Sequence, residues 1–257
     1  MRGLALAGAV WLSALAAQAD TASNQLFNAM GIPGLIAAFA EDGRETIGDI
    51  NSSFLGGQGG DVFLETAQRL YDPARMEAEL RASFAQLVDP ADARQAVVFF
   101  DSTQGQRIVE LEVQARQAMV DDALEDAAKA ASNDAGDDVL RLLSVRDLVE
   151  VNTDIAMAAR RAFYDGFLAA APSTDAPDIE GQRGMVAEDT RAWITGYYML
   201  VASAMEDDDL DTYTAFWETD VAQRVDAALS DAFEQSYVSL SYGMGQIVGR
   251  LMPQNDL

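Results

Sequence analysis

The stretch Phe99-Phe100-Asp101-Ser102-Thr103-Gln104-Gly105-Gln106-Arg107-Ile108 has a similar partner 117 residues later, Phe216-Trp217-Glu218-Thr219-Asp220-Val221-Ala222-Gln223-Arg224-Val225. Two shorter matches precede it at an offset of 113: Leu35-Ile36 with Leu148-Val149, and Phe54-Leu55 with Phe167-Leu168. A change of four residues in the length of a loop reconciles the two offsets. Three matches in the same order along the chain predict an internal duplication.

Each copy of this motif predicts a corner between two helices. An aromatic pair ends the first helix, and Ser102 or Thr219 caps the second, a contribution of ~1 kcal/mol. The small residue three positions later leaves room for a close helix crossing. We expect Arg107 to pair with Asp101 and Arg224 with Glu218, or each arginine to reach the preceding carbonyl ends; the alternative is an arginine-based anion site. The motif residues are Phe99, Phe100, Ser102, Gly105 and Arg107, and Phe216, Trp217, Thr219, Ala222 and Arg224.

The first copy resembles the signature of the DUF2059 family of secreted proteobacterial proteins: an aromatic pair, any residue, Ser, two residues, Gly, Gln and a basic residue. The resemblance extends over about Met76 to Met119. It implies an all-helical domain, an export signal and no assigned activity, so no catalytic residues carry over. The second copy departs from the signature, with Thr219 in place of Ser and Ala222 in place of Gly.

Apolar residues recur at helical spacing from about Leu26 to the C-terminus, and no segment predicts a strand. The polar, acidic run from Ser132 to Asp138 indicates a linker in the middle of the chain. We therefore predict an all-α fold with two related helical bundles, residues 20–136 and 137–257, after a signal peptide at residues 1–19.

The first 19 residues have the pattern of an export signal. Arg2 precedes an apolar run from Gly3 to Ala16, and Ala17-Gln18-Ala19 supplies the small residues that signal peptidase accepts. We predict cleavage between Ala19 and Asp20 and residence in the periplasm; a retained N-terminal anchor is the alternative. No later segment is long and apolar enough to span a bilayer, which needs ~20 residues.

The composition is strongly acidic. The chain has 42 acidic and 17 basic residues, a net charge of −25, and Lys129 is the only lysine. Such a charge repels nucleic acid and anionic lipids. It indicates a solvated surface or, alternatively, a cationic partner or divalent metal.

The chain contains no His and no Cys. Nucleophilic systems that need an imidazole base are therefore excluded, as are zinc, haem and iron–sulfur sites built on imidazole or thiolate. An enzyme would have to use carboxylates, as a carboxylate pair or a carboxylate-bound metal. We predict a protein that is not an enzyme and has no cofactor.

Two further groups of residues suggest binding sites. Asp207, Asp209, Asp211 and Glu218 occupy positions 1, 3, 5 and 12 of a calcium-loop template, but Thr212 stands where the template needs Gly, and the segment is predicted as a helix. Six aromatic residues at helical spacing form either core or the lining of a ligand pocket between the bundles. They are Phe163, Tyr164, Phe167, Trp193, Tyr197 and Tyr198.

Glycines near the C-terminus, Gly243, Gly245 and Gly249, resemble a dinucleotide-binding loop only superficially, because no strand precedes them. Their spacing indicates close helix packing instead. The leading functional hypothesis is a non-catalytic periplasmic protein with a protein-interaction or envelope-associated role. The alternatives are a small-ligand or divalent-cation binder that uses acidic loops and inter-bundle aromatics, and a carboxylate-pair hydrolase.

Overall fold

The computed structural model describes residues 21–171, 177–206 and 208–252. These residues form helices and turns with no strand, so the predicted all-α class is confirmed. The predicted signal peptide, with its cleavage point between Ala19 and Asp20, lies outside the described residues. Residues 21–29 form the first helical segment described.

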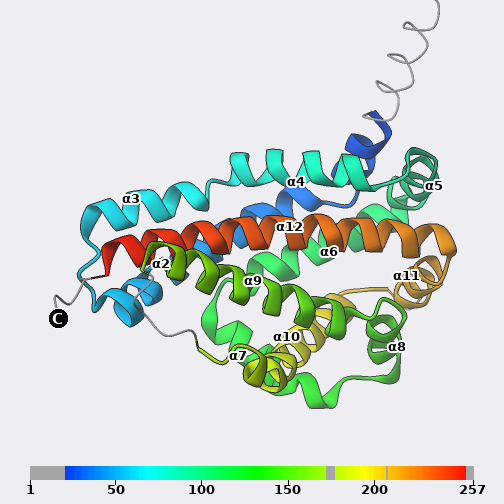
Figure 1. The fold of residues 1–257 in the computed structure, drawn as a ribbon. Helices are drawn as coiled ribbons and strands as arrows, with labels where there is room; N and C mark the ends of the chain where they lie inside the picture. Colours follow the sequence, from blue (N-terminus) through cyan, green and yellow to red (C-terminus); the bar gives the residue numbers. More distant parts are fainter. Residues whose placement is uncertain (1–20, 172–176, 207, 253–257) are drawn as a thin grey trace, which may run out of the picture.

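The first half of the chain continues with six helices, shown from blue to green in Figure 1. Their bounds are α2 Ile32–Leu55, α3 Gly60–Leu70, α4 Pro73–Leu87, α5 Pro90–Phe100, α6 Thr103–Ala118 and α7 Asp122–Ala131, followed by the short 3-10 helix η1 Ser132–Asp134.

The described part of the second half contains five α-helices and a second 3-10 turn. Their bounds are α8 Asp137–Val145, α9 Leu148–Ala170, η2 Glu180–Gln182, α10 Arg183–Ser203, α11 Asp209–Trp217 and α12 Asp220–Leu251. The last of these is the longest, with 32 residues, and it crosses the molecule from end to end beside α9 and α4 (Figure 1).

Local sequence signals set the helix boundaries in the first half. Asp72, Asp89 and Asp121 each accept hydrogen bonds from two main-chain N–H groups at the start of a helix, and proline follows the first two of them. These caps satisfy donors that have no partner within the helix. Gly31, with φ of 67°, turns the chain into α2, and Gly56, with φ of 58°, ends that helix.

Glycines bring α9 and α12 into close contact along their length. A Cβ atom added at Gly245 would overlap the main-chain oxygen of Phe163, and one added at Gly166 would overlap that of Tyr242. At Gly249 the added atom would lie 2.6 Å from the oxygen of Phe167. The two helices therefore run parallel with their backbones nearly touching, which accounts for the glycine spacing near the C-terminus.

Two clusters of buried side chains form the core. The larger draws residues from both halves of the chain, from Ala22 to Ala232. The smaller lies between α2, α3, α9 and α12 and includes Phe63, Tyr71 and Phe167. The described parts of the two predicted units thus share one core, and the exposed Gly136–Asp137 lies at the start of α8.

A membrane crossing requires a helix that is both long and apolar. None of the described helices combines the necessary length with a sufficiently apolar composition.

Substitution of Gly245 by Ala tests the close packing of α9 on α12. We expect the free energy of unfolding to fall by about 1–3 kcal/mol, because the added methyl group forces the two backbones apart. Gly48→Ala is the matched control, since a Cβ there meets nothing within 4 Å; it should leave stability unchanged or raise it by up to ~1 kcal/mol. Equal unfolding midpoints in urea for the two variants would contradict this packing.

Candidate functional site: a cavity lined by both halves

The repeated motif forms two helix corners with the same hydrogen bonds. The Ser102 hydroxyl accepts from the main-chain N–H of Gly105 at 3.0 Å and donates to the oxygen of Phe99. The Thr219 hydroxyl accepts from Ala222 at 3.2 Å and donates to the oxygen of Phe216. At the first corner, a Cβ on Gly105 would overlap the main-chain oxygen of Phe99. Glycine therefore allows the start of α6 to lie against the end of α5.

The two arginines of the motif pair with partners other than the predicted ones. Arg107 binds both carboxylate oxygens of Asp209, its Nε lying 3.0 Å from Oδ2, and Arg224 binds both oxygens of Asp92 at 2.7 Å. The predicted partners bond elsewhere: Asp101 accepts from Gln25, and Glu218 pairs with Arg141 at 2.7 Å. Each arginine thus crosses to the other half of the chain.

The aromatic pairs of the motif meet each other at the same place. The rings of Phe99 and Phe216 stack with centroids 4.2 Å apart and planes 8° from parallel. Phe100 and Trp217 make an edge contact at 6.0 Å. The two corners therefore pack directly against one another.

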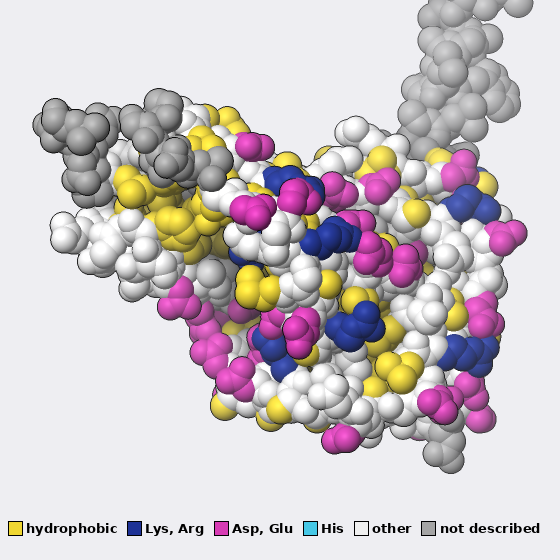
Figure 2. All heavy atoms as spheres, turned by 60° about the horizontal axis from the view of Figure 1, so that its bottom comes forward, with side chains coloured by type: hydrophobic (Ala, Val, Ile, Leu, Met, Phe, Trp, Pro, Cys, Tyr) yellow, Lys and Arg dark blue, Asp and Glu magenta, His cyan; other side chains and the backbone are white. Residues whose placement is uncertain are grey.

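The four candidate calcium ligands do not form an ion site among the described residues. Asp209 is 1% exposed, and its carboxylate accepts from Arg107, from Gln104 at 2.9 Å and from the main-chain N–H of Glu206 at 3.1 Å. Asp211 lies in α11, Glu218 pairs with Arg141, and Asp207 lies outside the described residues. Within the described ranges, no group of three acidic side chains converges. Figure 2 likewise shows acidic and basic side chains interspersed over one face.

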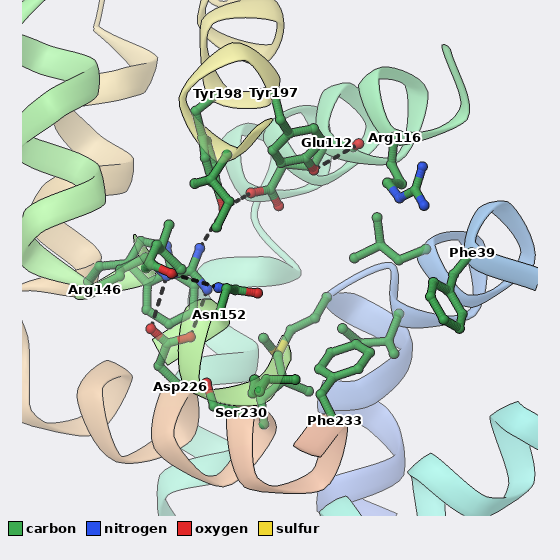
Figure 3. A pocket seen from close by; sticks show the side chains of 18 of the residues that line it. Phe39, Glu112, Arg116, Arg146, Asn152, Tyr197, Tyr198, Asp226, Ser230 and Phe233 are labelled. Atoms are coloured by element: carbon green, nitrogen blue, oxygen red, sulfur yellow. Dashed lines mark hydrogen bonds and ion pairs between the residues drawn. The ribbon is translucent and has the colours of Figure 1, made fainter. Parts of the chain in front are cut away.

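A cavity of about 230 Å³ lies between α2, α5 and α6 of the first half and α9 to α12 of the second, with Arg146 just after α8 also in its lining. Nine of the 22 residues that line it are aromatic, and four others carry Arg, Glu or Asp side chains. The aromatic residues are Phe39, Phe100, Trp193, Tyr197, Tyr198, Tyr213, Trp217, Phe233 and Tyr237. Figure 3 shows Arg146 and Asp226 on one side of the view, Arg116 and Phe39 on the other, and Glu112 between them at the top.

Glu112 is one of the two acidic residues that line the cavity. Its Oε1 accepts hydrogen bonds from the hydroxyls of Tyr213, at 2.7 Å, and Tyr198, at 3.2 Å. Tyr197 donates to the main-chain oxygen of the same residue at 3.0 Å. No described group donates to Oε2, which Figure 3 shows without a dashed line.

Arg146 links Glu112 to a second carboxylate. Its guanidinium binds both oxygens of Asp226, at 2.7 and 3.0 Å, and donates to the hydroxyl of Tyr198 at 2.7 Å. It also lies 4.0 Å from the centroid of the Trp217 ring. The result is a buried chain of contacts from Asp226 through Arg146 and Tyr198 to Glu112.

Burial raises the pKa of the Glu112 carboxyl, an effect that Arg146 and the hydrogen bonds from Tyr213 and Tyr198 partly oppose. Burial raises the pKa of Tyr197, Tyr198 and Tyr213 in the same way, so these hydroxyls stay protonated and act as donors.

Two buried donors in the cavity lining have no hydrogen-bond partner. They are Arg116 Nη1 and Trp217 Nε1. Among the described side chains, no other buried nitrogen or oxygen atom lacks a hydrogen-bond partner. Arg116 is 9% exposed and uses another nitrogen to pair with Asp42 at 2.6 Å. Since the great majority of buried polar groups in proteins are paired, two unpaired donors on residues of one cavity lining are unusual.

Of the six aromatic residues proposed as core or pocket, three line this cavity and three do not. Trp193, Tyr197 and Tyr198 face it, whereas Phe163, Tyr164 and Phe167 pack in or against the smaller core cluster.

Glu112 and Arg116 were missed by the sequence analysis. The signal that could have revealed them is their position on the buried stripe of α6. At Glu112, a charged residue stands where the helical spacing predicts a core residue.

The cavity also brings two acids together, as the hydrolase alternative requires. Glu112 and Asp226 both line it. Arg146 binds both oxygens of Asp226, so this carboxylate is ion-paired, whereas Glu112 is not.

Comparison with known families agrees with the motif. Residues 74–134 match the model of a family described as an uncharacterized protein conserved in bacteria (DUF2059), which confirms the resemblance seen around Ser102. This segment includes α5, α6 and α7, and therefore Glu112 and Arg116. No curated protein and no solved structure matches the chain.

The crossed pairs predict a pH dependence of stability. Hydrogen bonds from Arg224 and Arg107 lower the pKa of Asp92 and Asp209, respectively, below the unfolded value of ~3.9. Their contribution is therefore present above about pH 4 and is lost as pH falls through the lower folded values. We expect the Asp92→Asn/Asp209→Asn double variant to lose stability at neutral pH.

Urea unfolding at neutral pH and at about pH 3 measures this loss. The double variant should lose less stability on acidification than the wild type, whereas Asp49→Asn, at an exposed position of α2, should behave as wild type. Parallel losses in the wild type and the double variant would show that the crossed pairs contribute nothing.

Proposed function

We propose that this chain is a non-catalytic protein that binds a small organic molecule in the cavity between its halves. The supporting observation is that the two buried donors without a hydrogen-bond partner, Arg116 Nη1 and Trp217 Nε1, belong to residues that line the same cavity. The volume of about 230 Å³ is below the ~300–1,000 Å³ that is typical of pockets for drug-sized ligands, so the ligand is small. The aromatic lining supplies apolar contacts, and the donors require that the ligand carry an acceptor.

The absence of catalysis is part of the proposal. Catalytic acid–base work needs groups that are free to exchange protons with a bound substrate. In this cavity Asp226 is held by Arg146, and the tyrosine hydroxyls that contact Glu112 have raised pKa values. A steady-state assay that found hydrolysis abolished by Glu112→Gln would overturn this part of the proposal.

The protein-interaction hypothesis stays a prediction. Three of the most exposed large apolar residues, Val62, Val98 and Met185, lie on three different helices, α3, α5 and α10. Such scattered residues are ordinary on protein surfaces. The cavity is the more specific feature, and it favours the small-ligand alternative.

Export to the periplasm is part of the proposal as well. It rests on the N-terminal pattern of Arg2, the apolar run and Ala17-Gln18-Ala19. N-terminal analysis of the protein recovered from a periplasmic fraction tests it, and a mature chain that still begins at Met1 would contradict it.

We also infer that the two halves are copies of one unit. The equivalence of Arg107 with Arg224 and of Asp92 with Asp209, both at an offset of 117, supports this, because each arginine binds the aspartate of the other copy. The stacked pair, Phe99 and Phe216, occupies equivalent positions too. An alignment of relatives in which the two halves match unrelated families would contradict the inference.

Capture of small molecules tests the binding function. The mature protein is incubated with a periplasmic extract and repurified, and the released compounds are identified by mass spectrometry. We expect the wild type to retain a compound that Ser230→Phe does not, because Ser230 lines the cavity and a phenyl group fills it. Ser239→Phe, at an exposed position of α12, is the matched control. Identical profiles for all three proteins would refute the proposal.

A further inference from the structure

The charges of the cavity leave one acid without an ionic partner. Four charged residues line it, namely Arg116, Arg146, Glu112 and Asp226. Arg146 pairs with Asp226 at 2.7 Å, and Arg116 pairs with Asp42 at 2.6 Å. Glu112 forms no ion pair with any described residue; it has only the hydroxyls of Tyr198 and Tyr213. With all groups ionised, the four lining residues are neutral in sum, but Arg116 is already paired with Asp42 outside the lining, so Glu112 is the one charged group of the lining without a direct ion pair.

A buried carboxylate in this state is costly, because its charge loses water and gains no counter-ion. The free oxygen, Oε2, has no donor from the described residues. Burial also raises the pKa of the Glu112 carboxyl, because it disfavours the charged form. A cation bound in the cavity would remove the cost by pairing with the ionised carboxylate.

The rings around Glu112 suit a cation with organic substituents. Tyr197, Tyr198 and Tyr213 all contact it, Trp193 stacks on Tyr197 at 5.6 Å, and Trp217 lies 5.7 Å from Tyr213. The faces of aromatic rings attract cations, and such enclosures recognise quaternary ammonium groups. One ring of the lining already contacts a cationic side chain, since the Arg146 guanidinium lies 4.0 Å from the centroid of the Trp217 ring.

The geometry points to a small organic ammonium ion as the ligand of this cavity, with Glu112 as its counter-ion, the aromatic rings around its substituents, and an acceptor group that reaches Arg116 or Trp217. This inference rests on the proposed binding function and names the class of ligand. The net charge of −25 favours the encounter, because a strongly acidic protein attracts cations from solution.

The test compares two ligands of the same shape. Choline is titrated into the wild-type protein by calorimetry, beside the dimethylbutanol in which a carbon atom replaces the choline nitrogen. We expect choline to bind at least about tenfold more tightly, which corresponds to ~1.4 kcal/mol. Both compounds carry a hydroxyl oxygen that can accept from Arg116 or Trp217, so the difference isolates the positive charge.

A pair of variants assigns that charge preference to Glu112. Glu112→Gln keeps a carbonyl oxygen to accept from Tyr198 and Tyr213, and it should abolish the preference for choline. Glu110→Gln, at an exposed position of the same helix, should retain it. Retention of the preference in Glu112→Gln would overturn the assignment.

A measurement on the wild type alone covers the case in which Glu112→Gln does not fold. Choline is titrated in two buffers with different ionisation enthalpies, between about pH 4 and 7. The groups that face Glu112 are Arg146 of the α8 end, Tyr197 and Tyr198 of α10, Tyr213 of α11 and Asp226 of α12. We expect proton release on binding, because a bound cation favours the ionised carboxylate; its absence throughout this range would overturn the proposal.

The outcomes separate this inference from the proposed function. Equal binding of the two compounds, or tighter binding of the dimethylbutanol, overturns the ammonium class while the cavity remains a binding site. Binding of neither compound at ~1 mM overturns the ammonium class as well, and the capture experiment with Ser230→Phe then decides separately whether the cavity binds any small molecule.

Discussion

The stacking of Phe99 on Phe216 is the contact on which the arrangement of the two halves depends. These rings lie 4.2 Å apart at the point where α5 turns into α6 and α11 turns into α12. The crossed pairs of Arg107 with Asp209 and of Arg224 with Asp92 flank the stack. Each ion pair joins one half of the chain to the other. The two helix corners are therefore held together, and they set the directions in which α6 and α12 begin. The cavity is lined by these same helices together with α2, α9 and α10.

Packing explains most of the interior, and Glu112 is the exception. Glycines in α9 and α12 allow the two long helices to touch, and apolar side chains from both halves fill the larger core. A carboxylate on the buried stripe of α6 lowers the stability of such a core, so packing alone does not explain its presence. Its contacts with three tyrosines, the neighbouring Arg146–Asp226 pair and the two unpaired donors all lie on the wall of one cavity. A binding site accounts for these features together.

Much of the fold follows from local signals in the sequence. The helix corners at Ser102 and Thr219 could be predicted because capping acts within three residues. The close packing at Gly245 and Gly249 could be predicted from a four-residue glycine spacing. The partners of Arg107 and Arg224 could not, because each has an acidic neighbour in sequence and the chosen aspartates lie 102 and 132 residues away. The cavity was equally hidden, since aromatic residues at helical spacing look the same whether they fill a core or line a pocket.

The ionisation of Glu112 in the protein without ligand tests the central claim most directly. Carbon-13 NMR of the glutamate carboxyl groups, with Glu112→Gln to assign the resonance, follows the titration of this one group. The account predicts that Glu112 titrates above the ordinary glutamate value of ~4.3, because burial without a counter-ion disfavours its charge. A pKa at or below that value would mean that the charge of Glu112 is already compensated within the protein, and the case for a cationic ligand would fail.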